Sequence, residues 1–547
     1  MPLIRARQPA RPARASTGPA APVPAPPAEA RGSKTRHAAF TARYLPAIIP
    51  AAVMTALGLW GLARYQDMGN DEVVSRWAAL LPLWQLAHTL RYIDIVHGFY
   101  YLLLHGWMIF GTSPAIIRLP SVIGMAIAAI LIALIGRRLS GSGWVGLFAG
   151  LIMAVTPYLS FYAQTARSYA LVYACVLGQT MALLSALDAE KDGASRPERT
   201  RYWVLYGGLA TVAAYLNEMA LLVLAAHAVT VLLARYGREA IRHFAVAAAV
   251  AVVLATPLLG LSALQRGAIS YIGRPGLHDL ALLYHDYFGA TDPAALIVTA
   301  CAIVAVLPPL TWWRHRSDRA AAWWSSGDVS IPSVAVPLLL VPSGLLLVES
   351  RFAVPLYQDR YVLYCEAGAA LLAGAGVCRV GRWLAGVARR PELILVPGLA
   401  VCVCVLVLQL GYQQRIRLPA SRAFNYGGPA YFLAAHARPG DGVLFITSFY
   451  RKAELGYPDQ FSDARDFALA VPPWKARPYQ GINKPFSAVR PLLLSYRRIW
   501  VVGLRPSGRL TGEYGAESRE LMRYYRHVYL RSYKGIWVSL WIRRQLR

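Results

Sequence analysis

Long uncharged segments limit what this chain can fold into more than any other feature of its sequence. A bilayer core about 30 Å thick is crossed by roughly 20 apolar residues in an α-helix, and about eleven segments come close to that length. Their approximate limits are 45–65, 115–136, 143–160, 169–187, 202–217, 219–235, 243–264, 294–312, 331–348, 361–378 and 393–413. Since only Asn217 and Glu218 separate two of them, ten or twelve spans also fit the sequence. The pattern predicts an all-α polytopic membrane domain with about eleven helices.

The composition agrees with a membrane protein and argues against a nucleic-acid-binding protein. Hydrophobic residues make up 56% of the chain and charged residues 15%, whereas soluble domains average about 25% charged residues. The formal net charge is +28, but the arginines are spread over short loops between the apolar segments and form no single basic stripe. Basic loops that face the cytoplasm explain this distribution better.

Alternate loops differ in their basic content, which predicts the orientation of the chain. Lys and Arg accumulate in loops on the cytoplasmic side; one set of loops holds sixteen of them and the other set holds seven. The richer set, which we expect to be cytoplasmic together with the basic N-terminal tail, consists of Arg137, Arg138, Lys191, Arg196, Arg199, Arg201, Arg235, Arg238, Arg242, Arg314, Arg316, Arg319, Arg379, Arg382, Arg389 and Arg390. The acidic pair Asp71 and Glu72 belongs to the outward-facing set.

Three regions of the chain differ in composition. Residues 1–44 begin with a Pro-, Ala- and Arg-rich stretch without hydrophobic periodicity, which predicts a disordered basic tail in the cytoplasm. Residues 45–413 contain the apolar segments, and residues 414–547 mix polar, apolar and aromatic residues. Strand-like runs at 442–447, 498–503 and 535–541 predict that the last region is an extracytoplasmic α/β domain.

Asp71 and Glu72 are the most informative residues of the sequence. They form a side-by-side acidic pair just beyond the first apolar segment, in a chain that contains few acids. Such a pair at the edge of a bilayer suggests chemistry at the membrane surface. The alternative is that both are ordinary acids at a helix N-terminus, where the helix dipole favours them.

Short motifs follow the acidic pair in a recognisable order. Gly-Asn-Asp71-Glu72 is followed by two short amphipathic segments, the first of which could lie in the plane of the bilayer surface, by Tyr-Tyr-Leu-Leu-Leu-His-Gly-Trp and by Ile-Arg118-Leu-Pro-Ser. Later come Ala-Gln-Thr-Ala-Arg167-Ser-Tyr169-Ala-Leu and Asp-Arg360-Tyr361. In order and spacing, these motifs resemble the GT-C class of membrane glycosyltransferases, closest to the protein O-mannosyltransferase and aminoarabinose-transferase group, family 39 and its bacterial relatives.

The resemblance implies transfer of a sugar, often mannose in this group, from a polyprenyl-phosphate donor to an acceptor outside the cytoplasm. The residue types suit that reaction independently. An inverting single displacement needs one carboxylate to take the proton of the acceptor hydroxyl, and the resemblance makes Asp71 that base. Glu72 would support Asp71 or help to bind a cation or the acceptor. A phosphate leaving group needs cationic hydrogen-bond donors, which arginine supplies well.

Two arginine and tyrosine pairs are the candidates for binding the donor phosphate. Arg167 and Tyr169 lie at the outer end of a short span, and Arg360 and Tyr361 begin a later one. The alternative for each arginine is a place in an interfacial aromatic belt, with its charge extended towards water.

Further residues are candidates for lining the site: Asp94, His97, Arg118, His278 and His285. His97 stands where relatives often carry a His-Pro-Pro-like sequence, and here Gly98 and Phe99 depart from that pattern. His278 and His285 would share one helix face, which equally suits a helix lying on the bilayer. We assign no metal site, because no Cys or His cluster has zinc spacing and too few oxygen ligands can be named for Mg²⁺ or Ca²⁺. Asp71 and Asp94 could nevertheless share a divalent cation.

Two other functions also suit a polytopic membrane protein. A transporter or flippase of lipid-linked glycans would place ionisable residues at mid-membrane in internal repeats, whereas these apolar segments are nearly free of charge. A structural protein of an envelope complex would leave the acidic pair unconstrained. We expect a multi-pass glycosyltransferase of the bacterial plasma membrane whose partners are a polyprenyl-phosphate sugar, membrane lipids and a glycan, lipid or protein acceptor, with no nucleic acid.

Overall fold

The computed structural model describes residues 28–64, 67–307, 329–477, 479–505 and 512–544, without the side chains of residues 28–43, 268, 269 and 513. The chain divides into two compact units, Met1–Leu45 and Pro46–Arg547. Most of the predicted tail and the predicted basic loop of Arg314, Arg316 and Arg319 lie outside the described residues. The predicted boundaries at residues 44 and 413 stay predictions.

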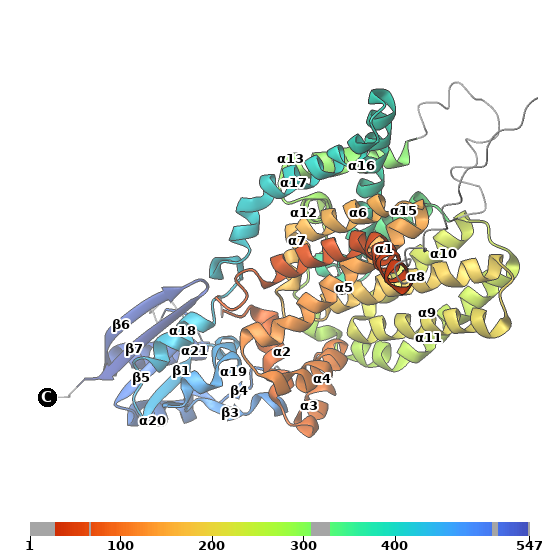
Figure 1. The fold of residues 1–547 in the computed structure, drawn as a ribbon. Coiled ribbons are helices and arrows are strands. Elements are labelled where there is room, and N and C mark those ends of the chain that lie inside the picture. The colour runs from red at the N-terminus through yellow and green to blue at the C-terminus, as the bar shows by residue number, and fades with distance from the viewer. Residues whose placement is uncertain (1–27, 65–66, 308–328, 478, 506–511, 545–547) are drawn as a thin grey trace, which may run out of the picture. The chain divides into compact units, whose positions relative to one another are not determined.

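Helices make up most of the second unit (Figure 1). In chain order the longer ones are α1 (Ala28–Leu59), α5 (Pro114–Ser140), α6 (Gly143–Val155), α7 (Pro157–Ala163), α8 (Tyr169–Lys191), α9 (Arg196–Leu216), α10 (Val223–Leu233), α11 (Arg238–Leu264), α12 (Leu277–Phe288), α13 (Asp292–Val306), α15 (Ile331–Phe352), α16 (Glu366–Ala388) and α17 (Val396–Arg415). The short helix η3 (Glu218–Leu222) precedes α10, and η6 (Asp359–Cys365) precedes α16. Each of the eleven predicted apolar segments falls on one or two of these helices, so the predicted helical membrane domain is confirmed.

The number of spans stays a prediction. Six helices are long and apolar enough to cross a membrane, or eight if each of two bent pairs counts as one span, among the residues that the structure describes. The bends are 71° each, between α6 and α7 and between α12 and α13. Pro157 causes the first break because its nitrogen has no hydrogen to continue the helical ladder. Gly289, at φ 139°, lies in the second break, in a conformation that glycine tolerates best.

Five short helices lie between α1 and α5: α2 (Asn70–Leu80), α3 (Leu83–Leu90), η1 (Ile95–His97), α4 (Gly98–Trp107) and η2 (Met108–Phe110). The amphipathic pattern suggested that the first of them lies on the bilayer surface. Instead, eight of the eleven residues of α2 are buried, and α2 packs against α19 (Lys452–Gly456) from the C-terminal region. A helix that the sequence assigned to the membrane surface is therefore covered by protein.

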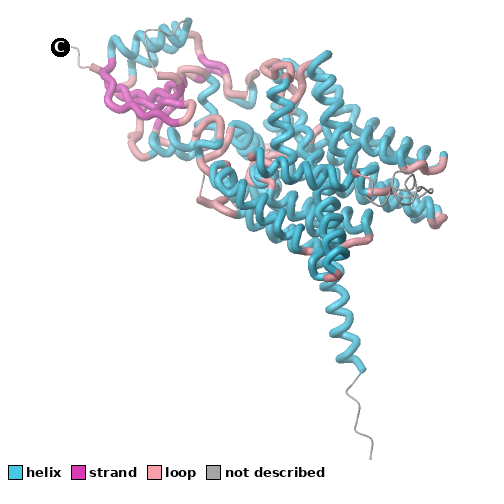
Figure 2. Tube along the Cα trace, turned by 90° about the horizontal axis from the view of Figure 1, so that it is seen from above, coloured by secondary structure: helices cyan, strands magenta, loops and turns pink. Residues whose placement is uncertain are grey.

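The C-terminal region contains a mixed five-stranded sheet, drawn in magenta in Figure 2. The strands run in the order β2 (Ala464–Asp466), β1 (Asp441–Phe445), β5 (Arg498–Gly503), β7 (Ile536–Arg543) and β6 (Tyr525–Tyr533). Strand β1 is parallel to β2 and β5, whereas β7 is antiparallel to β5 and β6. A separate antiparallel pair joins β3 (Leu469–Val471) to β4 (Ile482–Asn483). The predicted sheet-containing C-terminal domain is confirmed.

The two faces of the large sheet belong to different hydrophobic cores. One face packs against α18 (Gly427–Ala434) and α19, and its side chains, such as Phe445 and Trp500, are continuous with the core of the membrane helices. The other face packs against α20 (Phe486–Ser495) and α21 (Gly512–Tyr524) in a separate core. Because the first core is shared, the C-terminal region presents side chains directly to the residues around α2.

Candidate active site

The acidic pair lies in the first turn of α2, where the two carboxylates point into different surroundings. Glu72 closes the N-terminus of the helix, because its Oε2 accepts a hydrogen bond of 2.9 Å from the Gly69 amide. The side chain of Glu72 is 1% exposed, whereas that of Asp71 is 38% exposed. Only Asp71 therefore has a carboxylate that an incoming molecule can reach.

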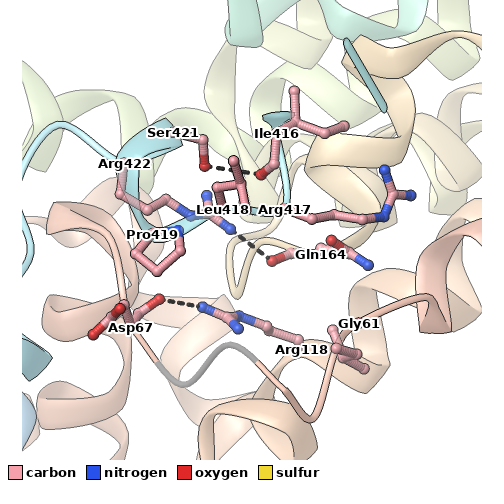
Figure 3. A pocket seen from close by; sticks show the side chains of 11 residues that line it. Gly61, Asp67, Arg118, Gln164, Ile416, Arg417, Leu418, Pro419, Ser421 and Arg422 are labelled. Carbon is pink, nitrogen blue, oxygen red and sulfur yellow. Dashed lines mark hydrogen bonds between the residues drawn. The ribbon is translucent and has the colours of Figure 1, made fainter. Parts of the chain in front are cut away.

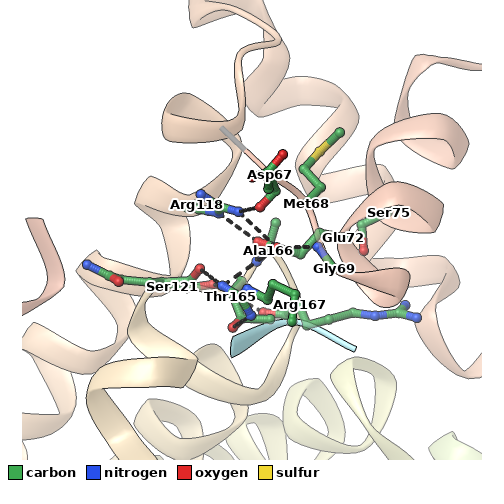
Figure 4. Close-up of polar contacts among 12 residues, drawn as sticks. Asp67, Met68, Gly69, Glu72, Ser75, Arg118, Ser121, Thr165, Ala166 and Arg167 are labelled. Carbon is green, nitrogen blue, oxygen red and sulfur yellow. Dashed lines mark hydrogen bonds and ion pairs between the residues drawn. The ribbon is translucent and has the colours of Figure 1, made fainter. Parts of the chain in front are cut away.

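Glu72 is held by four segments of the chain, and Figure 4 shows its contacts with Gly69, Arg118 and Ala166. The Arg118 guanidinium binds it through two bonds, with Nε 2.7 Å from Oε1 and Nη2 2.9 Å from Oε2. The Ala166 amide donates to Oε1 at 3.0 Å, and Arg422 lies 3.7 Å from Oε2. Burial alone would raise the pKa of Glu72, but Arg118 and Arg422 outweigh it and lower the pKa to about 2. Glu72 is thus a permanently charged anchor, and Arg118 binds it instead of lining the open site.

Asp71 faces two arginines that are far apart in the sequence. Its Oδ1 lies 3.5 Å from Nη2 of Arg167, and its Oδ2 lies 3.9 Å from Nη2 of Arg360. Burial would raise the pKa of Asp71, but these guanidinium groups lower it to about 2. The structure therefore brings together three of the predicted site residues around one partly open carboxylate.

Arg167 lies in the loop between α7 and α8 and is almost completely buried. It donates a hydrogen bond of 2.8 Å to the Tyr101 hydroxyl, and Tyr101 in turn donates to Asp94. Asp94 Oδ2 is itself 3.9 Å from Arg167 Nη1. The guanidinium thus lies between two carboxylates, Asp71 and Asp94, while its buried Nε has no hydrogen-bond partner in the structure.

Aromatic side chains surround the second arginine. Arg360 Nε donates a hydrogen bond of 3.1 Å to the Tyr169 hydroxyl, and the guanidinium lies 5.7 Å from the centre of the Tyr361 ring. His97 meets the Tyr169 ring edge to face, 6.3 Å between centres. Burial and the neighbouring Arg167 charge lower the pKa of His97 to about 4, so its imidazole is neutral at pH 7 and cannot add a third positive charge there.

An open cavity of about 400 Å³ begins at this cluster. Asp94, His97 and Tyr361 line it beside the arginines of the cluster. Its other lining residues are partly apolar, namely Val96, Met219, Leu221, Leu222, Leu259, Ala263 and Leu356, and partly polar, namely Asn217, Glu218, Ser262, Gln265 and Arg266. Its size lies within the usual range for ligand sites.

The C-terminal region supplies a cation that the sequence did not suggest. Lys452 is 3% exposed, and its Nζ donates a hydrogen bond of 2.9 Å to Oδ1 of Asn70, the residue before Asp71. The ammonium lies 4.1 Å from the centre of the Phe449 ring and 5.5 Å from that of Tyr479. Burial lowers the pKa of Lys452 to about 8. The cation therefore titrates close to neutral pH, beside the open carboxylate.

Comparisons with known proteins found one family model and several solved structures that resemble this chain. The family model for dolichyl-phosphate-mannose-protein mannosyltransferases matches residues 96–262. ArnT from Cupriavidus metallidurans bound to undecaprenyl phosphate has a TM-score of 0.57 at 14% identity, covering 90% of this chain and 97% of that one. The apo state of the same protein has a TM-score of 0.55 at 13% identity, with the same coverage of both chains. An oligosaccharyltransferase from Archaeoglobus fulgidus has a TM-score of 0.47 at 12% identity, covering 90% of this chain and 72% of that one. No curated protein sequence matches the chain.

The likeness to ArnT shows the fold, and the match of residues 96–262 to the family model indicates the activity. The chain has the ArnT fold and the activity class of a membrane glycosyltransferase. Its sugar, acceptor and catalytic residues are matters for proposal.

Two predicted residues of the glycosyltransferase lie apart from the Asp71 cluster. His278 is exposed on α12. His285 contacts residues that are close to it in the sequence, with Nε2 3.3 Å from Asp292 and Nδ1 3.1 Å from the Gly289 carbonyl. Within the described ranges, neither histidine contacts Asp71, Arg167 or Arg360. Nor do those ranges contain a group of three or more His, Cys, Asp or Glu residues placed to hold a metal ion, so a divalent cation stays a prediction.

A second, smaller cavity of about 20 Å³ lies behind Glu72 in the glycosyltransferase (Figure 3). Three guanidinium groups border it, those of Arg118, Arg417 and Arg422, together with Asp67. Arg422 donates to the Gln164 carbonyl at 3.1 Å, and Arg417 donates to the Leu57 carbonyl at 2.7 Å. The space suffices for about one water molecule. These arginines after α17 therefore fasten the C-terminal region to the loops that carry the site.

Proposed function

We propose that this glycosyltransferase moves a sugar from a polyprenyl-phosphate donor to an acceptor hydroxyl by an inverting single displacement, with Asp71 as the base. The observation that carries the proposal is the partly open Asp71 carboxylate between Arg167 and Arg360, at 3.5 and 3.9 Å, next to a cavity lined by Asp94, His97 and Tyr361 together with apolar side chains. A lipid-linked phosphate needs both parts, cations for its headgroup and an apolar length for its chain.

Arg167 and Arg360 hold the donor phosphate in this proposal. As the bond between the sugar and the phosphate breaks, negative charge develops on the phosphate oxygens, and guanidinium groups placed beforehand stabilise it. Tyr101 and Tyr169 orient the two arginines through hydrogen bonds of 2.8 and 3.1 Å. The polyprenyl chain follows the cavity walls at Leu222 and Leu259. The ArnT structure contains undecaprenyl phosphate, a lipid phosphate of this chemical class.

Asp71 takes the proton of the acceptor hydroxyl. With the site empty, the two guanidiniums hold the pKa of Asp71 at about 2, which makes the carboxylate a weak base. The donor is a phosphodiester with one negative charge, and when the same arginines bind it, that charge partly offsets theirs, so the pKa of Asp71 rises towards its ordinary range. Asp71 is thus a stronger base when the donor is bound than when the site is empty, which favours proton removal from the acceptor at the moment of transfer.

We further propose that the site and the C-terminal domain face away from the cytoplasm of a bacterial cell. The basic loops on alternate sides of the helices support this orientation. Mannose is the sugar to test first, because the matching family model is that of mannosyltransferases. The acceptor is a hydroxyl of a glycan, lipid or protein.

Sugar transfer by the purified full chain tests the proposal. The protein is reconstituted in vesicles with a radiolabelled polyprenyl-phosphate mannose and a crude envelope acceptor, with and without EDTA. We expect Asp71→Asn to lose transfer while keeping its yield and unfolding temperature, and Asp459→Asn, at an exposed acid of the C-terminal region, to keep transfer. Unchanged transfer by Asp71→Asn would reject Asp71 as the base. Movement of the labelled lipid across the vesicle without transfer would favour a flippase instead.

A further inference from the structure

A second large cavity is a groove between α9 and α11, and none of the residues of the proposed catalytic cluster lines it. Its volume is about 700 Å³. On α9 its lining residues recur every three or four positions, from Arg196 through Trp203 to Gly208, and on α11 they do the same from Glu239 to Leu254. Residues with that spacing share one helix face, so two complete helix faces form the walls.

The groove is charged at one end and apolar along the rest. Arg196, Arg199, Arg242 and His243 line the charged end, with Glu239 as the single carboxylate among the lining residues. Val204, Val246, Val250 and Leu254 line the remainder. Val204 and Leu254 are 67% and 51% exposed, so these apolar side chains have space in front of them that no described part of the protein fills.

The positive charge at this end is only partly neutralised by the protein. Glu190 lies beneath the groove and already binds Arg199 at 2.9 Å, His243 at 2.7 Å and Trp203 at 3.0 Å. Glu239 is 80% exposed and lies 3.7 Å from Arg199. Arg196 and Arg242 have no ion pair or hydrogen bond with any residue that the structure describes, and the buried Nε of Arg199 has no partner either.

The direction of the two helices adds to this charge. Helix α9 begins at Arg196 and α11 begins at Arg238, so both N-termini lie at the charged end of the groove. The partial positive charge of a helix N-terminus favours anions. Charge at the helix starts and apolar side chains further along match a lipid with an anionic headgroup and an acyl chain.

We propose that the groove between α9 and α11 binds an anionic phospholipid of the surrounding membrane, separate from the donor lipid. Its phosphate and headgroup lie against Arg196, Arg199 and Arg242, and one acyl chain lies along Val204, Val250 and Leu254. Gly208 provides room for that chain, because a side chain added there would meet no protein atom within 4 Å. The lipid would hold α9 and α11 together at their charged ends.

Lipid retention by the purified full chain tests this site. Protein in detergent is mixed with equal amounts of phosphatidylglycerol and phosphatidylcholine, and the bound lipids are counted by native mass spectrometry. We expect the wild type to retain phosphatidylglycerol preferentially. The double variant Arg196→Gln/Arg242→Gln should reduce that preference by about tenfold or more, since each basic residue near a membrane surface contributes about 1 kcal/mol to the binding of anionic lipid.

Two further variants make the result specific. Arg389→Gln/Arg390→Gln removes the same charge from two exposed arginines elsewhere and should keep the preference. Gly208→Leu fills the apolar part without changing charge and should release bound phosphatidylglycerol at an unchanged unfolding temperature in detergent. Equal losses in both arginine pairs, full retention by Gly208→Leu, or displacement of phosphatidylglycerol from this site by equimolar undecaprenyl phosphate would each overturn the proposal.

Discussion

Asp71 and Glu72 are neighbours in the sequence, but among the described residues their carboxylates share no hydrogen-bond or ion-pair partner. Asp71 faces Arg167 and Arg360 and is 38% exposed, whereas Glu72 is 1% exposed and bound by Arg118, Arg422 and two backbone amides. One turn of helix thus presents one acid to an incoming molecule and encloses the other. Replacing Glu72 should therefore affect the stability and activity of the protein differently from replacing Asp71.

Replacing Glu72 should destabilise the protein more than replacing Asp71. Glu72→Gln leaves the buried Arg118 guanidinium without its counter-charge, and breaking a buried pair in this way costs about 3–5 kcal/mol. Asp71→Asn changes a side chain that remains partly in contact with solvent, so its cost is smaller. Thermal unfolding of both variants in the same detergent measures the difference. An equal loss of stability in the two variants would contradict this reading of the pair.

The stabilising effect of Glu72 should depend on pH in a defined window. Its pKa is about 2 in the folded protein and 4.5 in a free chain. A group with a lowered folded pKa stabilises fully above its unfolded pKa and loses that effect as the pH falls towards the folded one. The difference in unfolding temperature between wild type and Glu72→Gln should therefore be constant from pH 7 to about 5 and shrink between about 4.5 and 2. A constant difference down to pH 2.5 would show that charge is not its source.

Arg167 and Arg360 should affect use of the donor. Removing one preorganised donor from a site where negative charge develops typically lowers kcat about a hundredfold or more. We expect Arg167→Gln and Arg360→Gln each to lose transfer to that extent, with normal expression. Arg351→Gln, at an exposed arginine near the end of α15, is the matched control and should transfer normally. Initial rates at several donor concentrations measure both kcat and KM.

Deprotonation of Lys452 should lower the activity at basic pH. Its pKa is about 8, so its positive charge beside Asn70 disappears as the pH rises through that value. We expect kcat/KM to fall above pH 8 in the wild type, to extend to higher pH in Lys452→Arg, and to be low and flat across this range in Lys452→Met. Lys475→Met, at an exposed lysine of the same region, should keep the wild-type profile. A wild-type profile in Lys452→Met would remove this lysine from the site.

Stability gives an independent check on Lys452. Its folded pKa of about 8 is below the 10.5 of a free lysine, so burying the charged amine costs stability below pH 8, and that cost is relieved as the pH rises from 8 towards 10.5. Lys452→Met removes the cost along with the hydrogen bond to Asn70. A loss of activity without a comparable loss of stability would therefore mark a role in the reaction and not only in folding.

The sequence predicted those features that follow from local pattern. Apolar length predicted the membrane helices, and short runs of apolar and aromatic residues predicted β1, β5 and β7. Strand β6 was missed because its exposed edge carries Arg526, His527 and Arg531, which interrupt any apolar run. Helix α2 was assigned to the bilayer surface because its amphipathic pattern reports an apolar face but not which partner covers that face.

The site was predictable only where a motif stood at a helix end. Asp71, Arg167 and Arg360 each occupy such a position, and the resemblance linked them. Lys452 and Arg422 lie in a region without a recognised motif, and Lys452 reaches Asn70 across 382 residues of sequence. Such a contact has no periodic pattern in the sequence, because it forms only when the shared core brings α19 against α2.

That distance in the sequence has a consequence for how the protein is made. The anchor of Glu72 requires Arg422, and the Asn70 contact requires Lys452, so neither is complete until the ribosome has passed the last membrane helix. A nascent chain that has inserted α1 to α17 still lacks these two contacts. The surroundings of Asn70 and Glu72 therefore reach their assembled geometry only after the final quarter of the chain has folded onto α2.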